Sequence, residues 1–396
     1  MRIVIVGAGP AGLYFALLMK RQDASHEVTI LERDGPDDTF GWGIVFSDQT
    51  FDYLRESDAP SYAAITGACE KWDNVDIVHR SERISVRGNR FSGVARIRFL
   101  NILQDRCREL GVDLRFHQPV TDLPALPRCD VLVGADGANS TVRRMREPLF
   151  QPTIEHGRNK YIWLGTPKLF HGLTLTFVDH PTGVYAAHSY RFDSATSTFI
   201  VECSEATWRA ARLDAMGEQE TCAWLEEIFR DHLGGQPLLT KNFVKWLNFP
   251  LVRNARWYGD DVVLLGDALH TAHFSIGSGT KLALEDAIVL SQAFARAQTS
   301  AAALPLFEEM RRPRVEQYQQ AAMDSLRWFE QMGEYMHLAP LAFAVEAMTR
   351  SKRVDVEKLK QRDPVFAARA AEFLTGDQEI KSALGLDKRS GDQENL

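Results

Sequence analysis

The sequence has 396 residues, of which 45% are hydrophobic and 25% charged, with a net charge of −7 and five cysteines. This length predicts two domains, and the acidic balance argues against a nucleic-acid partner. No apolar run approaches the roughly 18 residues that span a bilayer, so we expect no membrane segment. The scattered cysteines contain no CxxC pair and predict reduced thiols in a cytoplasmic protein without a metal site or a disulfide.

The first predicted element is a glycine-rich turn between a strand and a helix. Residues 2–7, RIVIVG, are typical of a buried parallel strand, and LYFALLMKR further on is typical of a helix. The turn between them has the GxGxxG pattern of Gly7, Gly9 and Gly12, which lets a backbone approach a pyrophosphate. A second strand ends at Glu32, whose carboxylate can accept ribose hydroxyls. These features predict a dinucleotide site without separating FAD from NAD.

A second glycine turn, VGADGANSTVRR at residues 133–144, raises the question whether it is another nucleotide site, a copy of the first or part of the same one. The preceding CDVLVG again indicates a buried strand. No GxGxxG pattern and no acidic residue at second-strand distance accompany it, so we do not expect a duplicate site. The alternative to a ligand-binding role is a strand-end turn held by Asp136 and Gly137, with Arg143 and Arg144 in solvent.

A third glycine segment covers residues 260–290. Its strand, VVLLG, ends just before Asp267, which can hold a ribityl hydroxyl. Gly277 and Gly279 precede a helix that we expect to begin near Thr280, and amides at such a start can face an anion or an electron-rich ring edge. Three separated elements that each suit one part of an extended ligand suggest one large cofactor.

In this order, GAGPAG, GADGANSTVRR and GDALHTAHFSIGSGTK resemble the group A flavoprotein aromatic hydroxylases, of the para-hydroxybenzoate hydroxylase type. The resemblance covers nearly the whole chain. It implies an α/β fold with a Rossmann-like, GR2-type FAD-binding domain, an inserted antiparallel β-sheet substrate domain and a C-terminal helical region. It also implies bound FAD, transient NADH or NADPH, and O2-dependent hydroxylation of an aromatic ring. The middle segment would then serve FAD and NAD(P)H together.

The resemblance assigns cofactor contacts to particular residues. The residues implied to bind the nucleotide half of FAD are Gly7, Gly9, Pro10, Ala11, Gly12, Glu32 and Arg33, and the middle turn would contribute Asp136 and Gly137. Asp267 would hold the ribityl and pyrophosphate region, and Gly277, Gly279, Thr280 and Lys281 would face the pyrimidine ring. Arg96 stands where the family has an arginine, although Phe99 replaces a leucine of that motif and Phe274 replaces a proline just before the flavin loop.

Between residues 155 and 255, short segments rich in aromatic and β-branched residues predict an antiparallel sheet. Alternation places Tyr161 and Trp163 on one face of their strand, and His188 and Tyr190 on one face of theirs. The predicted substrate contacts are Trp42, Val45, Tyr161, Trp163, His188, Tyr190 and Phe274. We expect FAD-binding parts at 1–150 (with about 70–100 of the sheet region contributing) and 256–300, a substrate sheet at 151–255, helices at 301–385 and a disordered tail at 386–396.

Four further segments resemble a subgroup of the family that acts on salicylyl-CoA, on anthraniloyl-CoA and on tryptophan in violacein biosynthesis: GWGIVFSD (41–48), HGRNKYIWLGT (156–166), STFIVECSEATW (197–208) and LRWFEQMGEYMHL (326–338). The resemblance implies a CoA thioester substrate, with conversion of salicylyl-CoA to gentisyl-CoA as the leading expectation. Arg350, Lys352 and Arg353 can meet CoA phosphates or form a solvated helix end. An indole-derived or other free aromatic substrate stays open.

A base that removes a phenol proton would help such a reaction, and histidine suits this role. The candidates are His188, His270 and His273, each of which can instead be a structural histidine, and Tyr161 is a further catalytic candidate. Rival classes are a flavin-dependent halogenase, whose WxWxIP segment this sequence lacks, a flavoprotein reductase, and an FAD-binding redox sensor. We expect a monomer or homodimer.

Overall fold

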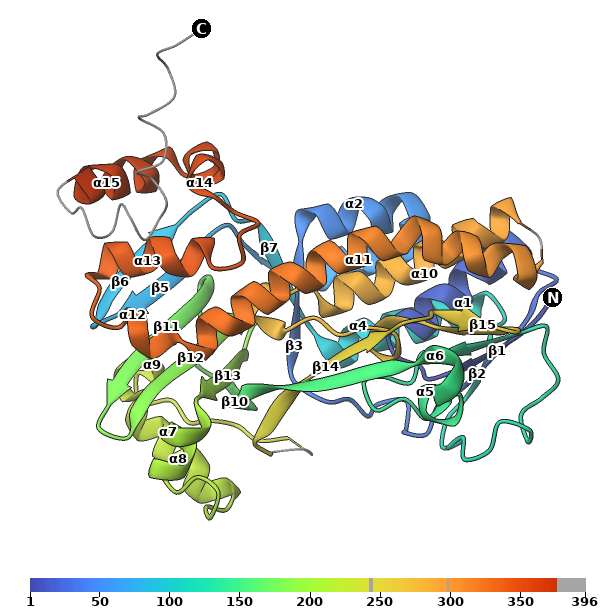
Figure 1. Cartoon of the computed structure of the whole chain (residues 1–396), viewed down its shortest axis with the longest axis horizontal. Coiled ribbons are helices and arrows are strands. Elements are labelled where there is room, and N and C mark those ends of the chain that lie inside the picture. Colours follow the sequence, from blue (N-terminus) through green and yellow to red (C-terminus); the bar gives the residue numbers. More distant parts are fainter. Residues whose placement is uncertain (242–244, 298, 376–396) are drawn as a thin grey trace, which may run out of the picture.

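The computed structural model describes residues 1–241, 245–297 and 299–375, so the predicted tail at 386–396 lies outside the described residues. A six-stranded sheet forms one end of the molecule (Figure 1). The strand order is β15 (Tyr258–Gly259), β16 (Val262–Leu264), β9 (Val131–Gly134), β1 (Arg2–Val6), β2 (Glu27–Leu31) and β8 (Asp113–Arg115). All neighbours pair in parallel except β15 with β16.

The three predicted buried strands that precede the glycine turns are neighbours in this sheet. β1 pairs with β9, and β9 pairs with β16. Because parallel strands end at the same edge of a sheet, the three turns that follow β1, β9 and β16 meet there. Sheet pairing therefore brings together segments that are more than a hundred residues apart in the sequence.

Helices cover the sheet and enclose the largest hydrophobic core. α1 (Pro10–Gln22) and α10 (Gly279–Arg296) lie side by side on one face (Figure 1), with the ring centroids of Phe15 and Phe294 6.2 Å apart. The shorter elements of this half are α2 (Asp48–Ser57), α3 (Ala59–Gly67), α4 (Arg96–Glu109), α5 (Thr141–Met145), α6 (Glu147–Phe150) and the 3-10 turns η1 (Gly266–Ala268) and η2 (Phe274–Ile276).

A seven-stranded, mainly antiparallel sheet forms the other end. Its order is β14 (Leu247–Asn254), β10 (Pro152–Thr166), β13 (Ser197–Cys203), β12 (Gly183–Arg191), β11 (Leu173–His180), β5 (Val75–His79) and β6 (Glu82–Val86). The predicted strands of residues 155–255 are β10 to β14. The segment of residues 70–100 contributes strands to two sheets. β5 and β6 join the seven-stranded sheet, whereas β4 (Glu70–Trp72) and β7 (Phe91–Ala95) form a small sheet with β3 (Gly43–Ser47).

Helices pack on both faces of the seven-stranded sheet. On one face, Phe199 of β13 packs against Phe229 between α8 and α9, with ring centroids 5.3 Å apart. On the other face, Phe177 of β11 packs against Phe343 at 4.7 Å. These helices are α7 (Glu205–Ala210), α8 (Glu218–Ile228), α9 (Arg230–Leu233), α12 (Met332–Tyr335), α13 (Pro340–Thr349), α14 (Val356–Arg362) and α15 (Pro364–Thr375).

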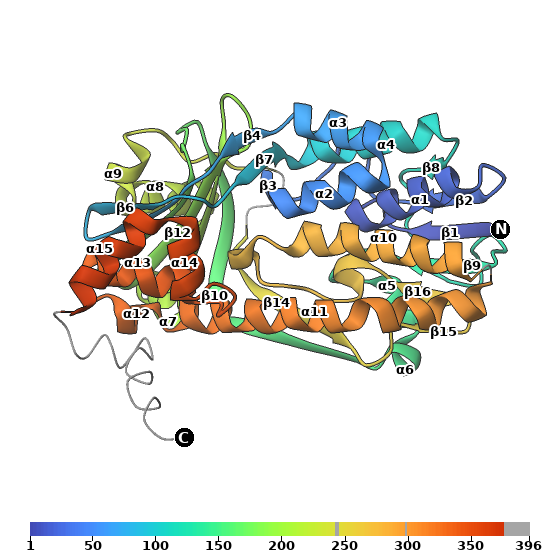
Figure 2. The ribbon, with the colours of Figure 1, turned by 90° about the horizontal axis from the view of Figure 1, so that it is seen from above.

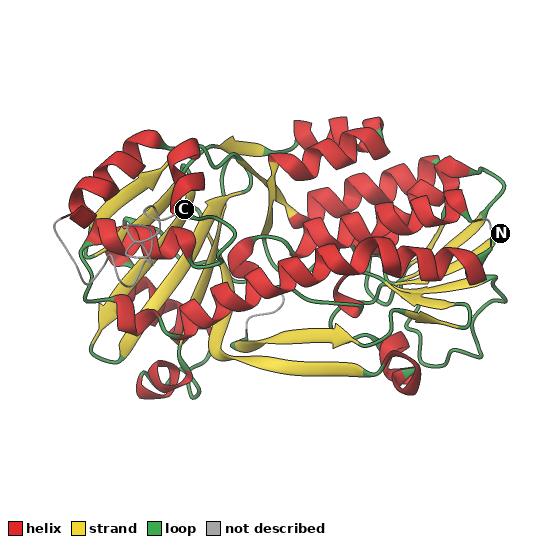
Figure 3. Ribbon diagram, turned by 45° about the horizontal axis from the view of Figure 1, so that its top comes forward, coloured by secondary structure: helices red, strands yellow, loops and turns green. Residues whose placement is uncertain are grey.

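Two long elements join the ends of the molecule. α11 (Ser300–Glu330) runs from the parallel sheet to the antiparallel one, as Figure 2 shows from above. Strands β10 and β14 form a two-stranded ribbon between the same two ends (Figure 3). Among the described helices, none combines the length and the apolar character that crossing a membrane requires.

Candidate functional site

A cavity of about 1270 Å³ lies where the parallel sheet, the small sheet and the antiparallel sheet meet. Residues from all three glycine turns line it, among them Gly7, Gly137 and Gly277. Its volume exceeds the range of about 300–1000 Å³ that one small ligand occupies, so it has room for a large cofactor and a second ligand. The middle turn is therefore part of the same site as the other two.

The first turn contacts the middle turn through backbone. Gly7 has φ +106°, and a Cβ at this position would lie 2.4 Å from the carbonyl oxygen of Ala135. A Cβ at Gly12 would lie 2.2 Å from the carbonyl oxygen of Gly7. At Gly9, in contrast, the nearest atom to such a Cβ is 3.8 Å away, and the residue lines the cavity. Gly7 and Gly12 thus serve packing, whereas Gly9 leaves room for a ligand.

Glu32 lies at the end of β2 on the cavity wall. One carboxylate oxygen accepts a hydrogen bond from the amide of Ala8 at 2.7 Å, and the other accepts one from the amide of Asp34 at 3.0 Å. These bonds fix the carboxylate beside the first turn. Pro10, Ala11 and Arg33 also line this end, although the guanidinium of Arg33 pairs with Asp34 at the surface.

The middle turn clamps the other two turns together. Asp136 caps α5, accepting hydrogen bonds from the amides of Thr141 at 2.6 Å and Val142 at 3.2 Å. Arg143 is 3% exposed and donates to the carbonyl of Ala268 in the third turn at 2.8 Å. Burial lowers the pKa of Arg143. The alternative of a solvated Arg143 is wrong, because its side chain bridges two turns, whereas Arg144 is exposed and lines the cavity.

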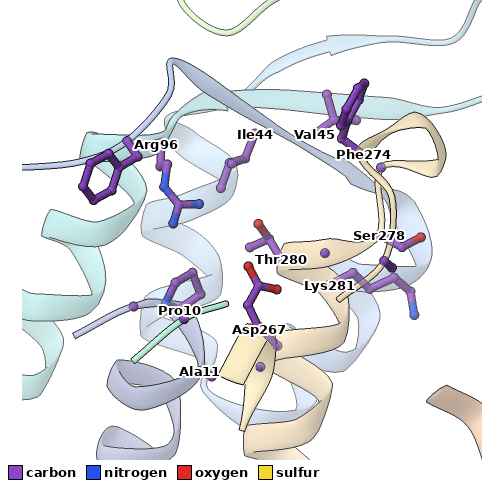
Figure 4. Close-up of a pocket in the computed structure, with 18 of the residues that line it drawn as sticks. Pro10, Ala11, Ile44, Val45, Arg96, Asp267, Phe274, Ser278, Thr280 and Lys281 are labelled. Atoms are coloured by element: carbon purple, nitrogen blue, oxygen red, sulfur yellow. The ribbon is translucent and has the colours of Figure 1, made fainter. Parts of the chain in front are cut away.

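Asp267 and Arg96 point into the cavity from opposite sides (Figure 4). The side chain of Asp267 is exposed to the cavity but lies deep between the sheets, and burial raises the pKa of its carboxyl while the charge of Arg96 opposes this shift. Burial also lowers the pKa of Arg96, whose Nε donates to Thr39 Oγ1 at 3.1 Å. Both residues line the cavity, and their contacts with FAD stay a prediction.

The third turn leaves its backbone open. Gly277 has φ +60°, and no atom lies within 4 Å of a Cβ placed at Gly277 or Gly279. The side chain of Thr280 reaches toward the cavity (Figure 4). The ammonium of Lys281 is buried against Glu285, so this residue can offer only backbone to a ligand.

A buried ion-pair network that the sequence reasoning missed supports the third turn. Asp286 accepts a hydrogen bond from the amide of Gly266 at 3.1 Å and one from Arg311 Nε at 2.7 Å. His270 Nε2 lies 2.8 Å from the same carboxylate. His270 therefore belongs to the support of the turn and does not line the cavity.

These residues fit FAD. Open backbone at Gly9, Gly277 and Gly279 alternates with carboxylates at Glu32 and Asp267 along a cavity long enough to connect all three turns. Adenosine ribose suits Glu32, the pyrophosphate suits the start of α1, and a flavin ring edge suits the amides that open α10.

Aromatic side chains line the end of the cavity next to the antiparallel sheet. This end of the cavity is lined by Trp163, His188 and Tyr190 of the sheet, by Phe274 of η2 and by Val45 of β3. Tyr190 donates to the carbonyl of Gly43 at 2.8 Å, which fixes its ring, and burial raises its pKa. Phe249, which the sequence reasoning did not single out, lines the same end 6.0 Å from the ring of Phe274.

His188 has a buried partner that the sequence reasoning missed. Its Nε2 lies 3.2 Å from Oε2 of Glu202, and the other carboxylate oxygen accepts from Asn159 at 2.9 Å. Burial raises the pKa of Glu202, but the hydrogen bonds from His188 and Asn159 oppose this effect, and the pKa lies below its ordinary value.

Besides Gly12 and His270, three more predicted site residues lie beside the cavity and do not line it. The ring of Trp42 covers Gly165, where a Cβ would lie 2.8 Å from it. The ring of Tyr161 packs behind Phe274 at 5.0 Å, and burial raises its pKa to about 12. His273 Nδ1 bonds Ser275 Oγ at 2.8 Å, and burial lowers its pKa to about 4.

A Rossmann-like sheet, a cradle that fits FAD and an aromatic second pocket define the class: this is an FAD-dependent aromatic monooxygenase, with NAD(P)H as the transient reductant typical of the class. The model of the FAD binding domain family matches residues 1–125 and 127–322, and the chain belongs to this family. The predicted family, fold, cofactor and enzyme class are confirmed.

Particular relatives agree with this class. The chain is 42% identical over 380 residues to salicyloyl-CoA 5-hydroxylase of a Streptomyces species, covering 93% of this chain and 73% of that protein. It is 35% identical over 359 residues to protodeoxyviolaceinate monooxygenase of Chromobacterium violaceum, covering 89% and 95%. A solved structure of 2-methyl-3-hydroxypyridine-5-carboxylic acid oxygenase shares the fold, with a TM-score of 0.70 at 19% identity over 89% of this chain and 98% of that one.

Proposed function

We propose that this monooxygenase hydroxylates the aromatic ring of an acyl-CoA thioester, and that its substrate is salicyloyl-CoA, hydroxylated at carbon 5. The 42% identity to a salicyloyl-CoA 5-hydroxylase supports the substrate. The observation that carries the chemistry is the buried pair of His188 and Glu202 at the aromatic end of the cavity that also fits FAD.

The pair suits removal of a phenol proton. The low pKa keeps Glu202 ionised at neutral pH, so its carboxylate holds the Nε2 proton of His188. This choice of tautomer, inferred from the hydrogen bonds, leaves Nδ1 of a cavity-lining ring as a proton acceptor. Loss of the phenol proton raises the electron density at the ring carbon para to the oxygen, which in a salicyloyl ester is carbon 5.

Bound FAD would carry two electrons from NAD(P)H to O2. One oxygen atom would then reach the ring, and the other would leave as water. The protein orients the ring between Trp163, Tyr190 and Phe274, whose apolar surfaces also exclude water. His188 accepts the phenol proton, and Glu202 stabilises the resulting imidazolium.

The test is O2-dependent NAD(P)H oxidation by the FAD-loaded protein with salicyloyl-CoA, benzoyl-CoA, salicylate and tryptophan. We expect strong stimulation by salicyloyl-CoA alone, with 2,5-dihydroxybenzoyl-CoA formed in proportion to the NAD(P)H consumed. The relative that acts on protodeoxyviolaceinate, of which this chain covers 95%, favours an indole-derived substrate as the second candidate. Stimulation by tryptophan or by free salicylate in place of the thioester would remove the CoA assignment and leave the enzyme class intact.

A further inference from the structure

Beyond its aromatic end, the cavity continues to an opening lined by arginines. Arg90, Arg353 and Arg362 line it, and we call these three residues the arginine mouth. They come from the turn between β6 and β7, from the loop between α13 and α14, and from the end of α14. All three side chains are exposed.

Backbone contacts hold two sides of this mouth together. Gly88, in the β6–β7 turn, has φ +71°, and a Cβ there would lie 2.4 Å from the carbonyl oxygen of Arg362. The amide of Arg87 donates to Asp363 at 2.8 Å, and Arg362 donates to Asn89 Oδ1 at 3.1 Å. The turn that carries Arg90 is therefore fixed against the end of α14, far from it in sequence.

The charges of the mouth are poorly neutralised. The guanidinium of Arg353 lies over the ring of Tyr318 at 4.1 Å, and that of Arg362 donates to a neutral amide. Within the described residues, neither has a carboxylate within ion-pair distance, and Arg90 has only the exposed Asp48 at 3.6 Å. Many exposed arginines elsewhere pair with a carboxylate at 3.2 Å or closer, among them Arg2, Arg33, Arg55, Arg83, Arg108, Arg115 and Arg209. Unpaired positive charge at a cavity opening attracts anions.

An apolar passage connects the mouth to the aromatic end. Val75 of β5, Leu173 and Leu175 of β11, and Met348 of α13 line the cavity where α13 packs on β5 and β6 (Figure 1). Leu175 pairs with His188, Leu173 pairs with Val75, and Val75 pairs with Val86 at the end of β6, so the strand register leads from the aromatic end to the turn that carries Arg90. A ligand that follows the cavity outward therefore meets an aromatic pocket, then an apolar passage, then the arginines. This order matches an aromatic acid joined through a weakly polar arm to a group of phosphates.

Two cations considered from the sequence have other roles. Arg350 donates to the carbonyl of Ser275 at 2.7 Å and to Ser325 Oγ at 3.0 Å, so it supports η2, which leads into the third turn. The ammonium of Lys352 lies 3.7 Å from Asp324 on the surface. Of the three residues considered, only Arg353 belongs to the mouth.

We propose that the arginine mouth binds the phosphates of the nucleotide arm of the thioester substrate, an inference that rests on the proposed function. Guanidinium groups donate paired hydrogen bonds to phosphate oxygens, and exposed ones add affinity without touching the reacting ring. The nicotinamide cofactor also carries phosphates, so the experiment has to distinguish the two sources.

The experiment measures KM and kcat of Arg353→Gln, Arg362→Gln and the double variant with salicyloyl-CoA, with the phosphate-free salicyloyl pantetheine thioester, and with NADH and NADPH. We expect KM for the CoA ester to rise about three- to tenfold per substitution, with kcat unchanged. KM for the pantetheine thioester and for the nicotinamide cofactors should stay at the wild-type value. Arg209→Gln on α7 is the matched control, an exposed arginine paired with Glu205 and outside the cavity lining.

An unchanged KM for the CoA ester would overturn the proposal, and so would a rise in KM for NADH or NADPH alone. Titration of the FAD-loaded proteins with CoA itself, followed by flavin fluorescence, keeps the proposal separate from the proposed function. If wild-type protein hydroxylates no thioester, the proposed function fails. CoA binding that weakens in both variants would then still support the mouth, whereas no CoA binding to the wild type would overturn it.

Discussion

His188 and Glu202 meet across 3.2 Å from neighbouring strands β12 and β13, and the two side chains are 4% and 1% exposed. The strand register pairs Ala186 with Glu202 and His188 with Ile200, which puts the two side chains on one face of the sheet as diagonal neighbours. The sheet itself therefore assembles the pair.

Removing the imidazole of His188 should lower kcat more than removing the charge of Glu202. We expect His188→Gln to lower kcat about 100-fold or more, the usual contribution of a positioned base. Glu202→Gln keeps a hydrogen-bond acceptor but loses the charge that stabilises the imidazolium, so we expect a smaller fall, about tenfold, and a changed pH profile of kcat. Bound FAD should stay at wild-type levels. Glu205→Gln, on the surface, is the control, and equal kcat in all three variants would contradict the role of the pair.

Asp267 is the acidic side chain that faces Arg96 across the cavity. If it holds the ribityl region, Asp267→Ala should weaken FAD binding about tenfold or more, since a hydrogen bond to a charged group is lost. The flavin absorbance of the purified protein measures this directly. Asp261→Ala, which removes an exposed carboxylate bonded to Ser300, is the control, and a variant that retains full FAD would refute the assignment.

Gly7 and Gly277 both have positive φ but different surroundings. Gly7→Ala combines backbone strain with a clash against Ala135, so we expect a loss of about 2–4 kcal/mol in the free energy of unfolding. Gly277→Ala has strain alone and should cost about 1–2 kcal/mol, while its new Cβ enters the cavity and lowers FAD affinity. Urea unfolding and FAD titration separate the two effects. Equal destabilisation by both substitutions would argue against the close contact at Gly7.

The strands, the turns and the cofactor could be predicted from the sequence because each depends on a local pattern. β-branched runs before glycines indicate buried parallel strands, and positive φ or close packing demands glycine. The adjacency of β1, β9 and β16 is a long-range property that spacing does not show. The chemistry of the three turns suggested one large cofactor, and the resemblance to a family supported a single site.

Residues whose role depends on a distant partner were predicted poorly. Arg143 looks like a surface residue in GADGANSTVRR, but its guanidinium reaches the third turn, 125 residues away. Glu202 carried a signal that could have been used, because a carboxylate inside the apolar strand STFIVECS has to be paired when it is buried. Trp42 shows the opposite error, because it was predicted to contact the substrate and instead has a packing role. Its ring fills the space over Gly165, and the sequence does not distinguish the two roles.

The contrast between Arg143 and Arg144 tests the clamp between the turns. Arg143→Met leaves the carbonyl of Ala138 without its donor and that of Ala268 with only the bond from Asn254, so we expect a loss of about 2–4 kcal/mol in the free energy of unfolding and weaker FAD binding. Arg144→Met removes an exposed contact with Thr141, and without FAD it should cost less than about 0.5 kcal/mol in the free energy of unfolding, although Arg144 lines the cavity. Urea unfolding of both variants with and without FAD makes the comparison. Similar free energies of unfolding for the two variants would show that the middle turn does not depend on the bridge from Arg143 to Ala268.

His273 gives the protein a stability that depends on pH. Burial lowers its pKa from 6.5 to about 4, so the folded state keeps the imidazole neutral while the unfolded state takes up a proton as the pH falls below 6.5. The free energy of unfolding should therefore decrease between about pH 6.5 and about pH 4, by up to about 3 kcal/mol from this group.

His273→Gln should make the pH dependence of the free energy of unfolding less steep, because the substituted side chain takes up no proton in either state. His26, His79 and His232, whose pKa values burial also lowers, keep their contributions. Urea unfolding of FAD-saturated protein at about pH 5 and about pH 7 measures the difference, in a range where most unfolded-chain carboxylates are still ionised. His337→Gln, at an exposed position, is the control and should keep the wild-type slope. If His273→Gln loses as much stability between the two pH values as the wild type does, the imidazole at position 273 is not the group that resists protonation.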